Sequence, residues 1–431
     1  MANISVDFEK IKGKIKPLHG VGQPPLYAGA KLFSRFHYLS ESGAPYSRLH
    51  DVGGLFGGNV YVDIPNIFRN FDADVNDPAS YDFTFTDALI TALIKAGVEP
   101  YYRLGVTIEN NAIIKSYHID PPKDYDKWAR ICEHIIAHYI DGWADGYNYK
   151  ITYWEVYNEV DDAFRVSQVW NGTKEDYYRL YEVTSKHLKS IFGDRIKVGG
   201  YAAINLHAGV APELYQDHPR RLYAIEFFHG FLKHNIECGA PLDFFSWHSY
   251  LNAAQTIPIA HWVREQLDSY GFKNTESHLN EWNPFHLERG TGHHSAEVSA
   301  MMIGMQKAPM DVMTIYDARS ATDDYCALFD PYTNRPFHAY YALVAFNHMY
   351  ELGNEAYAEC DSEGIYVIAA TDGNRKAILI SNISDAPEEE LNITGVDLTN
   401  ARYHVIDQPR LLSWSPAVKT IEKNMVVLIE F

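Results

Sequence analysis

Two Asn-Glu pairs are the residues of this sequence best suited to chemistry. Asn158-Glu159 ends the apolar segment 151–159, and Asn280-Glu281 lies in a second apolar segment, 277–282. Packing of a buried strand does not require such a pair at its end. Two carboxyl groups can hydrolyse a glycosidic bond, because one protonates the leaving oxygen while the other attacks the anomeric carbon or activates water. The paired glutamates therefore favour a glycosidase that needs no cofactor and no metal.

The distance between the two carboxyl groups, which sequence spacing leaves open, decides the stereochemistry of such a reaction. A gap of about 5–5.5 Å gives a covalent intermediate and retention, whereas a wider gap admits water and gives inversion. The proton donor needs surroundings that raise its pKa, and a nucleophile needs hydrogen-bond donors that lower its pKa.

Short apolar strands that alternate with longer amphipathic segments must position these glutamates. Strands are predicted at residues 17–21, 47–52, 99–105, 151–159, 196–202, 243–250, 276–282 and 312–318. Helices are predicted at 87–96, 124–143 and 177–192, and the apolar residues of 124–143 recur at the i, i+3, i+4, i+7 spacing of one helical face. This alternation predicts an α/β fold, a (β/α)8 TIM barrel over residues 17–350. A doubly wound open sheet is the alternative, but no GxGxxG or P-loop motif supports a nucleotide-binding version.

The C-terminal residues predict a second, smaller domain. Strands rich in Val and Ile are predicted at 363–371, 375–381, 388–393, 401–406 and 425–431, separated by turn residues as in antiparallel β-structure. Residues 355–431 are too few for a full immunoglobulin-like sandwich. We therefore expect a small accessory β-sandwich that takes a further strand from residues 1–16 and could provide the interface of a homo-oligomer.

Polar residues at the carboxyl ends of barrel strands form the active site in folds of this kind. Besides the glutamates, the residues at these ends are His50, Asp51, Arg103, His248, Tyr250, Tyr316 and Asp317. Trp247 and Trp282 are interpreted either as platforms for a sugar ring or as core packing. Glu155 lies on the same side of its strand as Glu159 but deeper in the barrel, which favours a structural role.

Bulk composition restricts the partners. The net charge of −19 argues against nucleic acid and against an anionic membrane surface, and the 14% aromatic content suits stacking on sugar rings. The four cysteines are scattered without a CxxC motif, so neither a zinc site nor a disulfide framework is expected. The sequence begins without an apolar signal region and has no run of about 18 apolar residues, which predicts a cytoplasmic protein.

Several motifs, taken in their order along the chain, resemble glycoside hydrolase family 39, a clan A family that includes β-xylosidases and α-L-iduronidases. They are YSRLHD at 46–51, YDFTFTD at 81–87, AGVEPY at 96–101, WEVYNE at 154–159, DFFSWHSY at 243–250 and EWN at 281–283. The resemblance covers roughly residues 17–350. It implies a retaining barrel enzyme with Glu159 as general acid/base and Glu281 as nucleophile.

The same resemblance implies how a sugar would be held. Asn158 would hydrogen-bond the sugar 2-hydroxyl, while His50, His248 and Tyr250 would line the subsite of the terminal sugar. Tyr250 would also touch the nucleophile. Arg103, Trp282 and Tyr316 complete the expected substrate-binding set.

Departures from the family pattern leave the sugar open. Tyr157 stands where Trp is typical, Val160 where Pro is usual, and Arg103 where xylosidases carry Glu-x-Gly-Phe-Met-Pro. Tyr316-Asp-Ala-Arg319 replaces a Trp-centred segment. The two arginines either favour an acidic or more hydroxylated sugar or pair with Asp or Glu.

We therefore predict an exo-acting retaining glycosidase that removes terminal sugars from short oligosaccharides. The substrate is a β-xyloside or a related glycoside, with an arabinoside, galactoside, glucoside or uronide as alternatives. The rival from another class is a non-catalytic carbohydrate-binding protein on a glycosidase barrel, which would keep all its function when Glu159 or Glu281 is changed to Gln.

Overall fold

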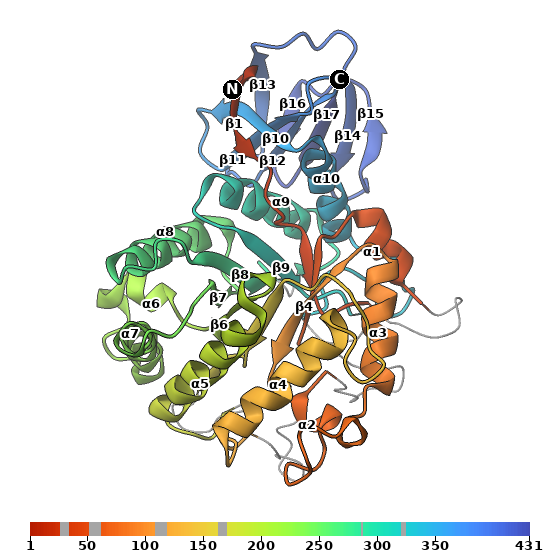
Figure 1. Cartoon of the computed structure of the whole chain (residues 1–431). Helices are drawn as coiled ribbons and strands as arrows, with labels where there is room; N and C mark the ends of the chain where they lie inside the picture. Colours follow the sequence, from red (N-terminus) through yellow and green to blue (C-terminus); the bar gives the residue numbers. More distant parts are fainter. Residues whose placement is uncertain (26–33, 51–61, 108–118, 163–169, 286–287, 320–324) are drawn as a thin grey trace.

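A closed barrel of eight parallel strands forms the body of the protein (Figure 1). The computed structural model describes residues 1–431 except 26–33, 51–61, 108–118, 163–169, 286–287 and 320–324. The barrel strands are β2 (Gly20–Gly22), β3 (Tyr46–Leu49), β4 (Glu99–Leu104), β5 (Tyr153–Val156), β6 (Lys197–Ala203), β7 (Phe244–Ser249), β8 (Glu276–Trp282) and β9 (Val312–Tyr316). Pairing of β2 with β9 closes the barrel, which confirms the predicted (β/α)8 fold.

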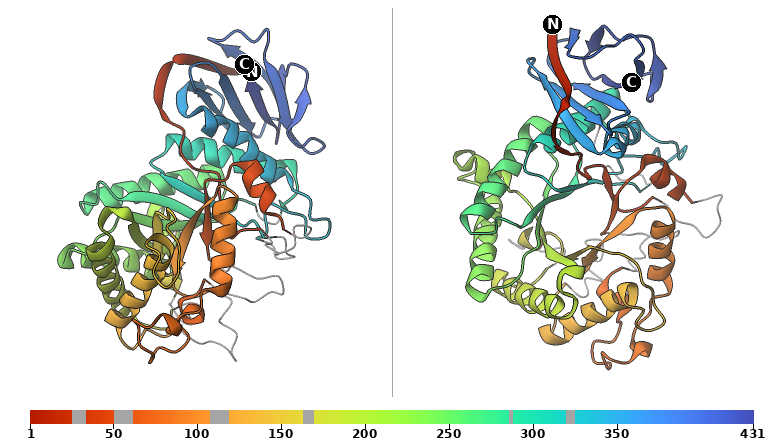
Figure 2. Two further views of the ribbon diagram at one scale, coloured as in Figure 1. Left: turned by 45° about the vertical axis from the view of Figure 1, so that its right-hand side comes forward. Right: turned by 45° about the horizontal axis from the view of Figure 1, so that its top comes forward.

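Helices surround the barrel, and their packing faces follow the apolar periodicity of the sequence (Figures 1 and 2). They are α1 (Phe36–Ser42), α2 (Ile64–Ile67), α3 (Thr84–Lys95), α4 (Tyr125–Ile140), α5 (Lys174–Phe192), α6 (His207–Val210), α7 (Pro219–Cys238), α8 (Ala253–Ser269), α9 (Gly292–Lys307) and α10 (His338–Leu352). Short 3-10 turns lie at Pro78–Ser80, Val160–Asp162, Gly193–Arg195 and Pro212–Leu214. The predicted helix at 124–143 begins at its cap, where the Asp124 carboxylate accepts from the Lys127 backbone N–H at 2.9 Å.

Several strands end before their predicted limits, and the fourth does so at the candidate site. The predicted strand 151–159 stops at Val156, because Tyr157 and Glu159 adopt left-handed backbone conformations with φ of 65° and 47°. Side chains of this size rarely adopt such φ values, so these two residues turn the chain sharply at the mouth of the barrel. Asp51, predicted to end the second strand, lies outside the described residues.

A bulge interrupts β8 where the second Asn-Glu pair lies. In the register with β7, Trp247 is opposite Leu279 but His248 is opposite Glu281, so β8 holds one extra residue, Asn280. Neighbouring residues of a regular strand point to opposite faces. The extra residue relaxes this rule and lets both Asn280 and Glu281 contact side chains inside the barrel.

A nine-stranded sheet forms the C-terminal domain, in the order β15-β14-β17-β12-β11-β10-β1-β13-β16. Its strands are β1 (Ala2–Lys14), β10 (Asn354–Cys360), β11 (Ile365–Thr371), β12 (Lys376–Asn382), β13 (Glu388–Thr394), β14 (Arg402–Ile406), β15 (Ser413–Ser415), β16 (Thr420–Glu422) and β17 (Val426–Glu430). The N-terminal strand β1 lies between β10, to which it is antiparallel, and β13, to which it is parallel. The sheet curls around its own apolar core, which completes the predicted barrel with a C-terminal β-sandwich domain.

The two domains share an apolar core. Ile368, Leu379 and Leu428 of the sheet belong to the same buried cluster as Met302 of α9 and the barrel residues. Figure 1 shows α9 and α10 lying between the barrel and the sheet. The Ser381 hydroxyl donates to the Ala296 carbonyl of α9 at 2.7 Å. Of the helices that the structure describes, none has the length and apolar character needed to cross a bilayer.

Candidate active site

Glu159 lies just beyond β5, at the carboxyl end of the barrel. Its backbone N–H donates to the Tyr201 carbonyl of β6 at 3.0 Å, which fixes the turned segment to the neighbouring strand. Its Oε1 lies 2.7 Å from Nδ1 of His248 on β7. The turn thus places the carboxyl group over the barrel mouth, where sequence analysis expected it.

Glu281 receives hydrogen bonds at both carboxylate oxygens. The Tyr250 hydroxyl donates to Oε1 at 2.5 Å, and Nη1 of Arg48 donates to Oε2 at 3.1 Å. Its side chain is 8% exposed, so these bonds form largely out of water. A carboxylate held by a guanidinium and a phenol is oriented for reaction and supplied with donors to its charged form.

His248 connects the two glutamates. Its Nδ1 contacts Glu159, and its Nε2 lies 3.7 Å from Oε2 of Glu281. One oxygen of Glu159 and one of Glu281 lie within 4.8 Å of each other and of a His248 nitrogen. The fold therefore brings together two carboxyl groups that are distant in the sequence.

The two carboxyl groups differ in electrostatic surroundings. Burial, reinforced by the nearby negative charge of Asp162, raises the pKa of Glu159 to about 7. Burial also raises the pKa of Glu281, contrary to the expectation that its donors would lower it, although His248, Arg48 and Tyr250 oppose the rise. Burial lowers the pKa of His248 to about 4, so its ring is neutral at pH 7 and does not compensate the charge of Glu159.

A buried Arg48–Glu155 pair lies beneath the glutamates, and sequence analysis missed the role of Arg48. Arg48 donates through Nε to Glu155 Oε2 at 2.8 Å and through Nη2 to Asn158 Oδ1 at 2.5 Å, besides its bond to Glu281. Glu155 Oε1 accepts from Ser246 Oγ and Asn280 Nδ2, both at 2.6 Å. Residues two apart in a strand share a face, so the choice of His50 could have led to Arg48 as well.

The two Asn-Glu pairs are therefore not equivalent. Asn158 accepts from Arg48 at the level of the glutamates, whereas Asn280 donates to Glu155 one layer below. Glu155 is fully buried and receives four polar contacts, which agrees with the structural role expected for it. The bulge in β8 is what separates the roles of the two asparagines.

Arg103 and Tyr316, also predicted to bind the sugar, form hydrogen bonds with other side chains. Arg103 is fully buried, donates to Asp63 Oδ1 at 2.6 Å and to His50 Nδ1 at 3.2 Å, and contacts neither glutamate. The Tyr316 hydroxyl accepts from Gln23 Nε2 at 2.8 Å, and its ring packs near that of Tyr250 with centroids 6.5 Å apart.

For the two tryptophans the structure favours core packing, and for the two arginines it favours pairing with aspartate. Trp282 is fully buried in the apolar core, as expected of a packing residue rather than of an exposed platform. Trp247 is also fully buried and donates through Nε1 to Ser277 Oγ at 3.1 Å. Arg319 pairs with Asp317 at 2.9 Å, as Arg103 does with Asp63.

A pocket of about 260 Å³ opens beside Glu159. Its lining includes His248 and Tyr250 together with Asn205, His207 and Arg220, which sequence analysis did not select. Arg220 donates to Asp162 Oδ1 at 2.6 Å, so an ion pair borders the pocket next to the acid/base candidate. No local motif marks these three residues, because they lie on the loop after β6 and on α6 and α7.

Glu159, His248 and Glu281 also have the spacing of metal ligands. The nearest oxygen of Glu281, however, already accepts from the buried guanidinium of Arg48. A cation beside that guanidinium would be repelled in a site of low dielectric. The trio is better suited to proton transfer than to holding a metal.

Comparisons with known proteins identify the family of this chain. The sequence matches the model of the family "Glycosyl hydrolases family 39" over residues 56–352. It is similar to a β-xylosidase of Geobacillus stearothermophilus, with 26% identity over 256 residues that cover 57% of this chain and 44% of that protein. The chain spans less than half the length of the curated relatives it matches.

Solved structures resemble the whole chain. A glucosidase from Croceicoccus marinus superposes with a TM-score of 0.76 at 20% identity, covering 100% of this chain and 98% of that one. A monomeric β-xylosidase from Caulobacter crescentus does so with a TM-score of 0.68 at 18% identity, covering 99% of each chain. At these identities the likeness shows a shared fold, a barrel joined to a β-domain.

Proposed function

Because this chain belongs to glycosyl hydrolases family 39 and is therefore a glycosidase, we propose that it is a retaining enzyme that removes terminal sugars from β-xylosides or related glycosides. The observation that carries the proposal is the pair of carboxylate oxygens within 4.8 Å of each other. This separation suits direct attack by one carboxylate, since inverting enzymes keep their carboxyl groups about 6.5–9.5 Å apart.

In the first step, Glu159 carries the proton and Glu281 acts as the nucleophile. A carboxylate oxygen of Glu281 forms a bond to the anomeric carbon while the glycosidic bond breaks, and Glu159 transfers its proton to the departing oxygen. A pKa of about 7 keeps much of Glu159 protonated at neutral pH. Arg48 and Tyr250 hold Glu281 in place and favour its ionised form.

In the second step, the ionised Glu159 takes a proton from water. The oxygen of that water bonds to the anomeric carbon, and the bond to Glu281 breaks. Both glutamates return to their starting states, and the sugar leaves with the configuration it had in the substrate. The pocket beside Glu159 is the place where the leaving group and then the water would lie.

A neutral sugar fits the site better than a uronide. Arg103 and Arg319, the cations proposed to recognise an acidic sugar, are each paired with a buried aspartate. Two curated relatives by sequence are named β-xylosidases, which supports a xyloside among the neutral candidates. Arabinosides, galactosides and glucosides remain the alternatives.

Hydrolysis of a panel of aryl glycosides, with NMR detection of the first-formed anomer, tests the proposal. We expect release of xylose with retained configuration, and at least about 10³-fold loss of kcat in Glu281→Ala. An inverted first product would refute the covalent mechanism. Undiminished activity of Glu281→Ala would refute the assignment of the nucleophile. Sugar binding without hydrolysis of any glycoside would instead support the carbohydrate-binding rival.

A further inference from the structure

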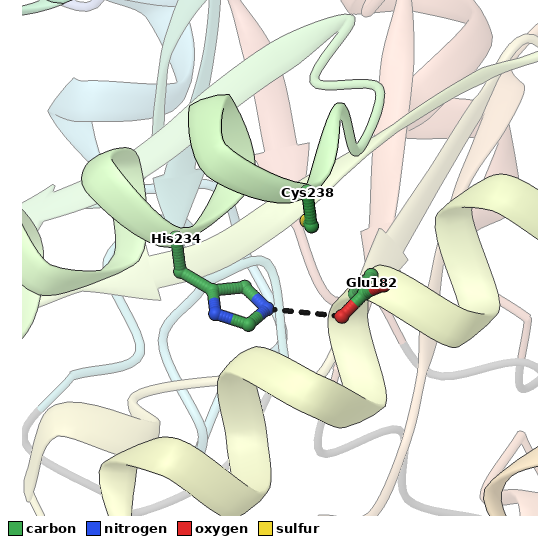
Figure 3. A group of neighbouring side chains, drawn as sticks. All are labelled: Glu182, His234 and Cys238. Atoms are coloured by element: carbon green, nitrogen blue, oxygen red, sulfur yellow. Dashed lines mark hydrogen bonds and ion pairs between the residues drawn. The ribbon is translucent and has the colours of Figure 1, made fainter.

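Three side chains with metal-ligating atoms meet on the outside of the barrel, between α5 and α7. Glu182 comes from α5, and His234 and Cys238 come from α7 (Figure 3). Cys238 ends α7, shortly before β7 begins, so the group lies toward the amino ends of the strands, opposite the glutamates at the barrel mouth. The group is therefore separate from the glycosidase site.

The spacing of these side chains is that of a ligand set. His234 and Cys238 are four residues apart on one helix and share a face. Nε2 of His234 lies 3.1 Å from Oε2 of Glu182, and these two atoms and the Cys238 sulfur all lie within 4.8 Å of one another. Ligand atoms around tetrahedral zinc are about 3.3–3.7 Å apart, given bond lengths of about 2.0–2.3 Å. Small side-chain rotations would bring the three atoms to one ion.

The donor types select the kind of metal. A nitrogen, a sulfur and a carboxylate oxygen suit Zn²⁺, whereas Mg²⁺ and Ca²⁺ prefer sites built of oxygen alone. Three protein ligands leave the fourth tetrahedral position to water. On binding, Cys238 would ligate as a thiolate and release its proton to solvent.

The surroundings also hold the ligands in position. Arg179 and Lys186 contact Oε1 of Glu182, at 2.9 and 3.0 Å, so Oε2 is the oxygen that points to His234. Both cationic side chains are exposed to solvent, which weakens the effect of their charge on an ion at the other side of the carboxylate. The Cys238 sulfur lies 3.8 Å from the Asn235 carbonyl, at the helix end whose dipole favours a cation.

We propose that Glu182, His234 and Cys238 form a Zn²⁺ site that joins α5 to α7. The sequence predicted no zinc site, because its cysteines are scattered. The fold supplies the missing ligand from another helix, so the site is invisible to a search for CxxC spacing. By binding the folded chain alone, the ion would stabilise it in proportion to the logarithm of the zinc concentration.

Zinc titration of the full chain tests this site. We expect one Zn²⁺ per chain by calorimetry and a zinc-dependent rise in the thermal unfolding midpoint. His234→Ala and Cys238→Ser should each weaken Zn²⁺ binding by at least about 100-fold, beyond the 10–100-fold typical of changes outside the ligand shell. His187→Ala is the matched control, since His187 pairs with Glu133 in the same way but without a thiol. Cys360→Ser is the control for a partly buried cysteine elsewhere.

A second readout keeps the test decisive if a variant folds poorly. Co²⁺ bound to the parent protein should give thiolate-to-metal charge-transfer absorption that Cys360→Ser keeps and Cys238→Ser abolishes. Absence of Zn²⁺ binding in the parent, or binding of equal strength in Cys238→Ser, would overturn the proposal. The second result would show that Cys238 is not a ligand of the bound ion, and activity measurements play no part in either conclusion.

Discussion

The buried pair of Arg48 and Glu155 makes the site sensitive to one substitution, Arg48→Met. Methionine fills a similar volume but leaves Glu155, whose side chain has no exposure, without its cation. Ser246 and Asn280 still donate to Glu155, but the negative charge is no longer compensated. Removing one partner of a buried ion pair costs about 3–5 kcal/mol, so we expect the free energy of unfolding to fall by that amount.

Adding Glu155→Gln to Arg48→Met removes the uncompensated charge. We expect the double variant to recover about 1–3 kcal/mol relative to the sum of the single changes, as contacting residues do in double-mutant cycles. Activity should not recover, because Glu281 and Asn158 still lack the donors that Arg48 provides. A loss of about 10²–10³-fold in kcat is expected, similar to the loss of one preorganised donor in an active site.

Urea denaturation measures the free energies, and hydrolysis of an aryl β-xyloside measures kcat. Arg69→Met is the matched control, because Arg69 pairs with Asp82 at 2.7 Å while its side chain is 65% exposed, and such surface pairs contribute about 1 kcal/mol or less. The reasoning fails if Arg48→Met destabilises no more than Arg69→Met. It also fails if the stability changes of Arg48→Met and Glu155→Gln simply add.

Three further predictions concern the glutamates. Tyr250→Phe removes the 2.5 Å hydrogen bond to Glu281. A hydrogen bond to a charged group contributes about 1.5–3 kcal/mol, so its loss should lower kcat/KM by about 10–150-fold. Circular dichroism should show that the variant remains folded. Because Glu159 must be protonated and has a pKa of about 7, kcat/KM should fall above about pH 7. Asp162→Asn removes a negative charge that raises this pKa, so the fall in kcat/KM should begin at a lower pH. An unchanged pH profile would contradict the role of Asp162 in raising the pKa. The pKa of Glu159 is higher in the folded chain than its ordinary 4.5, so the free energy of unfolding should decline as the pH rises from about 4.5 to 7. In urea denaturation at pH 8, Glu159→Gln should therefore be more stable than the parent by up to about 3 kcal/mol.

Much of the fold could be predicted because strongly periodic or apolar segments report their own structure. The buried runs of β4, β7 and β8 and the amphipathic pattern of α4 depend on burial alone, and the structure has elements at all four. The strand β10 was missed because its sequence, NEAYAEC, is rich in Glu and Ala and lacks β-branched residues. Pairing with β1 and β11 makes it a strand, and that information is not local.

The candidate site was predictable in its residue types but not in its geometry. Glu159 and Glu281 stood out because each follows an Asn in an apolar strand. The left-handed turn at Glu159 and the bulge at Asn280 are properties of the backbone that no side-chain pattern signals. Strand alternation could have selected Arg48, but its partners come from two other strands or their ends, β5 and β8, and only the closed barrel brings them together.

The strand β1 has a consequence for how the molecule is assembled. It joins β10 to β13, and its Ile4 lies opposite both Cys360 and Ile393, so the sheet is completed only when segments some 350–390 residues apart meet. Closure entropy grows only with the logarithm of loop length, so such long separations add little further entropic cost at equilibrium, but pairing between distant segments slows folding. Until β1 docks, β10 and β13 each expose an unpaired edge that another chain could occupy. Docking of β1 covers both edges, and it therefore protects partly folded chains from associating with one another.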